Sequence, residues 1–142
     1  DRQPAFESGG AGLVSTIDDY ARFAQMLLNE GELDGRRILR PATVRFMTAG
    51  QLNQAQQLAF VRNFSNMPGF SYGNLMRVMK DPGQSATLNH VGEYGWDGWL
   101  GCYFANDPAA RMTMLFMMQK TDSGLTSVVR RMRNLFISET EN

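Results

Sequence analysis

The sequence predicts an α+β fold in which helices come first, an antiparallel meander of about three strands follows, and a C-terminal helix packs on the sheet. Three observations predict it. Apolar residues recur at helical spacing near the start and again near the end, and β-compatible stretches separated by turns lie between them. The 142 residues fit one domain, with a helical segment over 1–50, a long loop over 51–72, and the sheet plus last helix over 73–142.

A first helix is predicted just after Thr16. Ser15 or Thr16 supplies the N-cap oxygen, and Asp18 and Asp19 place negative charge in the first turn, where the helix dipole favours it. Gly31 is well placed for a left-handed C-terminal cap. The side chains of one buried stripe follow the helical period: Ile17, Tyr20, Ala21, Ala24, Leu27 and Leu28.

A second, shorter helix is predicted between Pro41 and Gly50. The residues 33–35, Leu-Asp-Gly, read as a turn before it, and Pro41 suits the first helical position because its φ angle is already helical. Its apolar contacts are expected from Val44, Phe46 and Met47.

The stretch 51–72 begins with four glutamines in seven residues and shows no clear hydrophobic period. We expect a long loop here. Loops of this length are commonly functional or mobile, so the loop either borders a substrate cleft or is a surface excursion.

Strands are predicted over 74–80, 99–105 and 112–119. The first is closed by the turn 81–83, Asp-Pro-Gly, and the other two are joined by 106–109. The strand over 112–119 is almost continuously apolar, which is typical of a central strand covered on both faces.

A C-terminal helix is predicted after Asp122 or Ser123, either of which can cap it. Its apolar stripe consists of Leu125, Val128, Val129, Met132, Leu135 and Phe136. The basic cluster Arg130, Arg131, Arg133 and Arg111 is interpreted as a solvated surface.

Charge and cysteine content exclude several classes of partner. Fourteen basic and fourteen acidic residues give a formal net charge of zero, which argues against nucleic acid or an anionic membrane as the partner. The single Cys102 excludes an internal disulfide and is interpreted as a small apolar residue. No apolar run approaches the roughly 20 residues that span a bilayer. The first residue, Asp1, fits a piece of a longer chain.

Two stretches carry a family resemblance. They are Ser8 to Thr16, Ser-Gly-Gly-Ala-Gly-Leu-Val-Ser-Thr, and Tyr94 to Phe104, Tyr-Gly-Trp-Asp-Gly-Trp-Leu-Gly-Cys-Tyr-Phe, followed by 106–108, Asn-Asp-Pro. From about Ser8 to Phe136 the chain resembles the C-terminal part of the serine β-lactamase, penicillin-binding-protein and esterase superfamily, in its class C-like branch. The resemblance implies a partial domain, a small-molecule ester, amide or lactam substrate, no cofactor, and a periplasmic or secreted protein.

The third active-site motif of that superfamily maps by resemblance to Trp96-Asp97-Gly98. Trp96 and Asp97 are then expected to contact substrate, with Glu93 and Tyr94 shaping the rim. A glycine at 98 lets a substrate carbonyl approach, and the Trp99 amide would point at the oxyanion. The acid Asp97 departs from the usual threonine or glycine and would repel a substrate carboxylate. Alternatively, Trp96 and Trp99 are ordinary strand aromatics.

Two other short motifs also match active-site motifs of the superfamily by their letters. His90-Val91-Gly92 is a His-x-Gly candidate whose histidine titrates near neutral pH, but the residues after Trp96-Asp97-Gly98 match the family strand better. His90 and Glu93 alone do not make a metal site, so no metal is expected. Tyr72-Gly73-Asn74 matches the second motif by its letters and is interpreted as a chance match.

The nucleophile of the superfamily is a serine followed three residues later by a lysine, and no serine here has that lysine. Only Lys80 and Lys120 exist. We therefore expect this chain to be inactive alone and to need an N-terminal part of the same fold. The alternative is a non-catalytic binding or assembly module, in which an open sheet edge favours a homodimer or a domain swap.

Overall fold

The computed structural model describes residues 8–9, 12–121 and 127–140. The helices are α1 (Ile17–Leu28), α2 (Pro41–Thr48), α3 (Gln54–Asn63) and α4 (Ser127–Thr140), with one 3₁₀ turn at Pro82–Gln84. The strands are β1 (Glu32–Leu33), β2 (Arg36–Arg37), β3 (Phe70–Tyr72), β4 (Arg77–Met79), β5 (Tyr94–Asp97), β6 (Tyr103–Asp107) and β7 (Met112–Phe116). The expected α+β class is confirmed. No helix in these ranges is long and apolar enough to cross a membrane.

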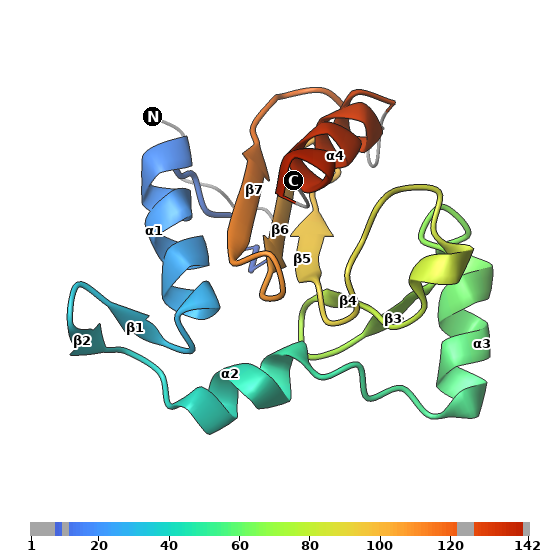
Figure 1. Ribbon diagram of the computed structural model, residues 1–142, viewed down its shortest axis with the longest axis horizontal. Helices are drawn as coiled ribbons and strands as arrows, with labels where there is room; N and C mark the ends of the chain where they lie inside the picture. The colour runs from blue at the N-terminus through green and yellow to red at the C-terminus, as the bar shows by residue number, and fades with distance from the viewer. Residues whose placement is uncertain (1–7, 10–11, 122–126, 141–142) are drawn as a thin grey trace.

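One antiparallel sheet forms the centre of the molecule, in the order β3-β4-β5-β6-β7 (Figure 1). It has five strands where about three were expected. Phe104 packs with α1 residues on one face, whereas its neighbour Tyr103 packs with Val129 of α4 on the other. Since successive strand residues point to opposite faces, α1 and α4 cover opposite faces of the sheet.

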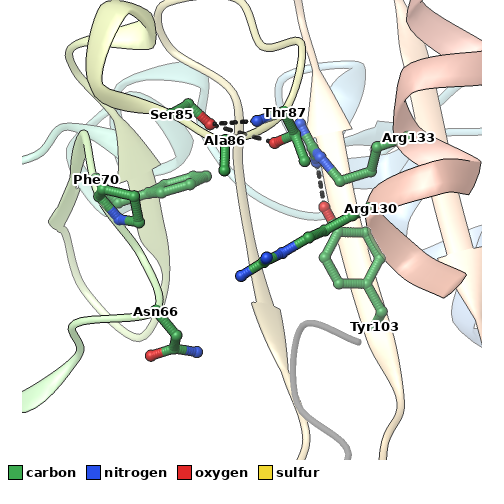
Figure 2. A pocket seen from close by; sticks show the side chains of 9 residues that line it. Asn66, Phe70, Ser85, Ala86, Thr87, Tyr103, Arg130 and Arg133 are labelled. Atoms are coloured by element: carbon green, nitrogen blue, oxygen red, sulfur yellow. Dashed lines mark hydrogen bonds between the residues drawn. The ribbon is translucent and has the colours of Figure 1, made fainter. Parts of the chain in front are cut away.

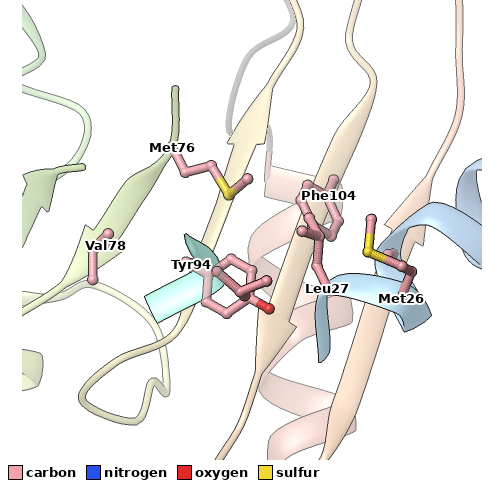
Figure 3. Close-up of a cluster of buried hydrophobic side chains, with 8 residues drawn as sticks. Met26, Leu27, Met76, Val78, Tyr94 and Phe104 are labelled. Carbon is pink, nitrogen blue, oxygen red and sulfur yellow. The ribbon is translucent and has the colours of Figure 1, made fainter. Parts of the chain in front are cut away.

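The α1 side holds the largest buried cluster. Ala24 and Leu27 of α1 pack there against Val78, Tyr94 and Phe104 of the sheet (Figure 3). Burial of these side chains removes apolar surface from water and fixes α1 on strands β4 to β6.

The ends of α1 follow the predicted signals. The Thr16 side chain accepts a hydrogen bond from the Asp19 amide at 3.2 Å. Gly31 has a φ of 94°, and its amide donates to the carbonyl of Met26 at 2.8 Å. Ile17, expected in the buried stripe, is instead 49% exposed.

The turn before α2 is confirmed and closes a hairpin between β1 and β2. Asp34 and Gly35 both have positive φ angles, 52° and 72°, as a two-residue hairpin turn of the Asp-Gly type requires. Pro41 starts α2 as predicted. The contact expected from Phe46 is wrong, because this side chain is 58% exposed.

The stretch expected to be a long loop contains α3 and β3. Asn53 accepts from the Gln56 amide at 2.9 Å, and the Gln56 side chain accepts from the Asn53 amide at 3.0 Å, which is a complete capping box. Glutamine is a good helix former, but only Phe60 is buried in this helix. The hydrophobic period is therefore weak, and the cap was the signal that could have found the helix.

The strand boundaries differ from the prediction. The stretch 74–80 contributes only β4, and β6 runs on through Asn106 and Asp107, which were expected in a turn. The turn after β4 forms as predicted, with the Asp81 side chain accepting from the Gly83 amide at 3.1 Å. Residues 99–102, expected in a strand, form the turn between β5 and β6.

The apolar strand β7 lies at the edge of the sheet, where a central position was expected. In the described part of the chain it pairs only with β6. Its composition is explained by its faces, because α1 and the α4 cluster pack against it from opposite sides. The apolar content of a strand indicates that its two faces are covered, but it does not indicate whether its hydrogen-bonding edge is paired.

Helix α4 presents a different stripe from the predicted one. Val129, Arg133 and Ile137, four residues apart, are buried, whereas Val128, Leu135 and Phe136 are exposed. The interpretation of Arg133 as solvated is therefore wrong, since its side chain is buried in an ion pair with Glu93. The predicted cap residues 122–123 and Leu125 lie outside the described residues.

Candidate active site

The predicted motif lies where β5 ends and turns into β6. Trp96 and Asp97 close β5, opposite Phe104 and Tyr103 of β6. The Gly98 amide donates to the Cys102 carbonyl at 2.7 Å, and the Gly98 carbonyl accepts from the Gly101 amide at 2.9 Å. Trp99 and Leu100 form the tip of this tight turn, and the Trp99 residue is 72% exposed. The hairpin thus presents residues 98–100 at the surface.

Glycine is not required at position 98 by its neighbours. A Cβ built there would have the Cβ of Cys102 as its nearest contact, at 3.6 Å, an ordinary separation. Gly95 of the same strand differs, because a Cβ there would lie 2.0 Å from the Phe104 carbonyl oxygen. The absence of a side chain at Gly98, where the neighbours do not require glycine, is consistent with a ligand approaching the backbone at that point.

Trp96 belongs to an aromatic corner built from three elements. Its ring lies 5.4 Å from that of Tyr72 on β3 and 6.0 Å from that of Phe64 at the end of α3, both edge to face. Phe60 extends the group, 4.9 Å from Phe64. Edge-to-face pairs of this kind orient the rings as well as burying them. The structure therefore brings Tyr72, whose Tyr-x-Asn motif was interpreted as a chance match, next to Trp96.

Asp97 points into the protein. Its side chain is 4% exposed, and Oδ1 accepts a hydrogen bond from Arg77 Nη1 at 2.6 Å. Burial raises the pKa of the Asp97 carboxyl, and the charges of Arg77 and Arg133 oppose that rise. Sequence reasoning placed this acid in contact with substrate. Since Arg77 balances its charge, the repulsion expected toward a substrate carboxylate is reduced.

Tyr94 and Glu93, expected at the rim, are buried. Tyr94 is 3% exposed, and its hydroxyl accepts from Asn106 Nδ2 at 3.1 Å. Burial raises the pKa of its phenol. The same Asn106 amide donates to the carbonyl of Ala24 in α1 at 2.8 Å. Tyr94 therefore anchors β5 to β6 and α1 from inside the core.

A second buried charge network lies under β5 and was not predicted. Arg133 of α4 donates to both carboxylate oxygens of Glu93 and to the Leu88 carbonyl. It also donates to the Tyr103 hydroxyl (Figure 2). Burial opposes the charge of Arg133, but its hydrogen bond to Glu93 and the other interactions there raise its pKa above the ordinary value. The sequence signal was an arginine spaced four residues from Val129 and Ile137.

A small cavity adjoins this network. Its volume is about 20 Å³, and Ser85, Thr87, Tyr103 and Arg133 are among the residues that line it (Figure 2). That space suits about one water molecule, so an ester substrate does not fit there.

His90 lies away from the motif. Its Nδ1 is 2.7 Å from Oδ2 of Asp107, at the end of β6 farthest from Tyr103. Asp107 is fully buried and also accepts from the amides of Ala109 and Ala110. Within the described ranges, no three His, Cys, Asp or Glu side chains gather as metal ligands would. His90 therefore has a local partner and does not adjoin Gly98.

Comparison with known proteins decides the family, because the Beta-lactamase family model matches residues 1–137. This chain belongs to the Beta-lactamase family. The resemblance read from the two sequence stretches is thereby confirmed, and with it the β-lactamase-like fold.

Named relatives of this β-lactamase-family chain include an esterase. This chain is 35% identical over 119 residues to protein Rv1367c of Mycobacterium tuberculosis, and the match covers 82% of this chain and 30% of that protein. Esterase EstB of Burkholderia gladioli is 29% identical over 123 residues, covering 86% of this chain and 28% of EstB.

Among solved structures, EstCE1, a hydrolase with promiscuous acyltransferase activity, has a TM-score of 0.70 and 27% identity. That match covers 91% of this chain and 31% of EstCE1. The chain thus spans less than a third of the length of each of these three relatives.

Proposed function

We propose that this chain is the C-terminal part of a serine hydrolase that cleaves a small-molecule ester, amide or β-lactam through an acyl-serine. Family membership and the likeness to EstB and EstCE1 support the reaction class. The nucleophilic serine and its lysine would come from a preceding part of the same fold, because these 142 residues contain no Ser-x-x-Lys. No cofactor is required for that chemistry.

The observation that carries the proposal is the room for a small group at Gly98, where an added Cβ would make only ordinary contacts with Cys102, at 3.6 Å or more. A substrate carbonyl lying against this turn meets no side chain at Gly98, and the next amide is that of Trp99. When the serine oxygen bonds to the carbonyl carbon, the carbonyl oxygen becomes negative, and a hydrogen bond from the Trp99 N–H stabilises it. Collapse of this intermediate breaks the carbon–oxygen or carbon–nitrogen bond, and the leaving oxygen or nitrogen takes up the proton that the serine gave up. Water then releases the acid from the serine.

The other motif residues divide into two groups by their burial. Trp96 and Gly98 are proposed to contact substrate, with the partly buried Tyr72 and the exposed Phe64 beside the Trp96 ring. Asp97 and Tyr94 are proposed to support the motif from inside the protein without contacting substrate, since both side chains are buried and hydrogen-bonded within the protein. An ester is the substrate to test first, because EstB is an esterase.

Hydrolysis of p-nitrophenyl acetate and nitrocefin by the full-length parent and by this chain tests the assignment. We expect turnover by the parent and none by the chain alone. A fluorophosphonate probe, which labels activated serines, should react with the parent at a serine outside these 142 residues, as peptide mass spectrometry would show. Labelling within the chain, or a parent that neither hydrolyses nor labels, would contradict the proposal.

A non-catalytic assembly module is the second candidate, and the open edge of β7 favours it. Within the described ranges β7 has a free hydrogen-bonding edge, and exposed Leu135 and Phe136 lie on α4. Such an edge can pair with the rest of the same fold, or with a second copy in a homodimer or domain swap. Light scattering on the parent distinguishes them, because an inactive dimer joined through β7 supports the module and an active monomer supports the hydrolase.

A further inference from the structure

Arg77 is an unusual residue for the centre of a sheet. It is fully buried on β4, directly opposite Gly95 of β5. Its guanidinium lies 4.8 Å from the centre of the Tyr103 ring and 5.4 Å from that of Phe70. An arginine is seldom fully buried unless its charge is paired, so its partners indicate what it does.

Those partners are on the hairpin that carries the motif. One terminal nitrogen donates to Oδ1 of Asp97 at 2.6 Å, and the other donates to the Phe104 carbonyl at 3.2 Å. One side chain of β4 therefore holds the end of β5 and the facing part of β6 together. Because a guanidinium is planar and its donors are fixed in direction, it sets orientation as well as distance.

Stability alone does not explain this arrangement. Arg77 Nε and Asp97 Oδ2 are buried and have no hydrogen-bond partner among the described residues, so both charges are incompletely satisfied there. A buried ion pair commonly adds no more stability than apolar side chains of the same volume. A geometric role is the alternative that the contacts support.

We propose that Arg77 is a positioning residue that, through Asp97, fixes the Gly98–Trp99 backbone for catalysis. Asp97 immediately precedes Gly98, whose amide and carbonyl are held on the other side by Cys102 and Gly101. The Gly98 carbonyl, which belongs to the same peptide as the Trp99 amide, is thus held by Gly101, and the residue before Gly98 is held by Arg77. The catalytic consequence rests on the proposed function; the structural consequence does not.

The two tryptophans of the chain, Trp96 and Trp99, provide a direct readout of the hairpin. With 5-fluorotryptophan incorporated, the chain should give two ¹⁹F NMR resonances, which Trp96→Phe assigns. We expect Arg77→Lys to shift or broaden the Trp99 resonance, because a lysine cannot hold Asp97 and the Phe104 carbonyl with one planar fork. Arg77→Met should do so more strongly.

Asp107→Asn is the matched control, since Asp107 is equally buried and lies at the other end of β6. It should leave the Trp99 resonance in place, with circular dichroism showing that each variant is folded. If Arg77→Met does not fold, Arg77→Lys carries the test. A folded Arg77→Lys chain with an unchanged Trp99 resonance would overturn the positioning role.

Kinetics of the full-length parent test the catalytic consequence. We expect Arg77→Lys to lower kcat for p-nitrophenyl acetate by about tenfold or more with little change in KM, as misplacement of a transition-state donor does. Loss in KM alone, or an unchanged kcat, would overturn that consequence. An inactive wild-type parent would instead remove the proposed function and leave the resonance test standing.

Discussion

The amide of Gly98 donates to the carbonyl of Cys102 at 2.7 Å, and a Cβ added to Gly98 would make only ordinary van der Waals contacts with Cys102, at 3.6–3.8 Å. Backbone hydrogen bonds therefore close the turn. A side chain at position 98 would enter the region where the proposed substrate carbonyl lies, without disturbing the protein itself.

Gly98→Ala should therefore fold normally and lose activity. Its Cβ would meet the Cβ, carbonyl oxygen and amide nitrogen of Cys102 at 3.6–3.8 Å, which are ordinary contacts, so the melting temperature should stay close to that of the wild type. In the parent, kcat/KM for p-nitrophenyl acetate should fall by about tenfold or more, because the methyl group displaces the carbonyl from the oxyanion donor. Calorimetry and steady-state kinetics measure the two effects.

Gly95→Ala is the matched comparison and, unlike Gly98→Ala, should lower the stability of the fold. Its Cβ would lie 2.0 Å from the Phe104 carbonyl oxygen, which is backbone and cannot move aside. Overpacking of this kind typically costs about 1–3 kcal/mol, and we expect at least that loss in urea unfolding. Equal stability of the two alanine variants would contradict the described packing of the hairpin.

Asp97 should make the chain less stable as pH rises. Burial raises its pKa in the folded protein above the ordinary value of 3.8, so the folded state binds more protons than the unfolded state between the two pKa values. The contribution is fully present below the unfolded pKa and is lost as pH rises through the folded pKa. Urea midpoints measured from about pH 3 upward should show this loss in the wild type and not in Asp97→Asn.

Arg77→Met should move that loss to higher pH, because the charge that opposes the rise in the Asp97 pKa is removed. The same urea series measures it. A pH profile of Arg77→Met that coincides with the wild type would show that the two side chains are not coupled.

Arg133→Met should be strongly destabilising. It leaves the fully buried Glu93 carboxylate without its partner, and breaking a buried pair in this way costs about 3–5 kcal/mol. The double variant Arg133→Met with Glu93→Gln should recover part of the loss, since the buried charge is gone. Denaturant unfolding of the single and double variants gives the comparison, and equal stability of both would argue against the pair.

Asn53→Ala tests the helix that replaced the expected loop. Removing the side chain that accepts the Gln56 amide should lower the free energy of unfolding by about 1 kcal/mol. Asn53→Ser, which retains a capping oxygen, should recover most of it. If neither change has any effect in urea unfolding, the capping box does not stabilise α3.

Features encoded by neighbouring residues were predictable from the sequence. The Thr16 cap, the Asp34-Gly35 turn and the Pro41 start all depend on residues a few positions apart, and all three appear in the structure. Helix α3 was missed because its buried face holds a single residue, Phe60, so that no period develops. The short strand β3 was missed with it.

The buried charges were not predictable, because each depends on a distant partner. Arg77 and Asp97 are 20 residues apart, and Arg133 and Glu93 are 40 apart. One signal was present, however. Trp96 and Asp97 are consecutive strand residues and must point to opposite faces, so they were not both free to face one substrate.

The most direct test of the account is the amide of Trp99. Trp99→Pro removes this N–H at the second position of the turn, where proline is well tolerated, and Trp99→Ala removes the side chain but keeps the N–H. In the full-length parent we expect Trp99→Pro to lower kcat for p-nitrophenyl acetate by about 10²-fold or more, and Trp99→Ala to lower it much less. Equal activity of the two folded variants would contradict the oxyanion role and, with it, the proposed site.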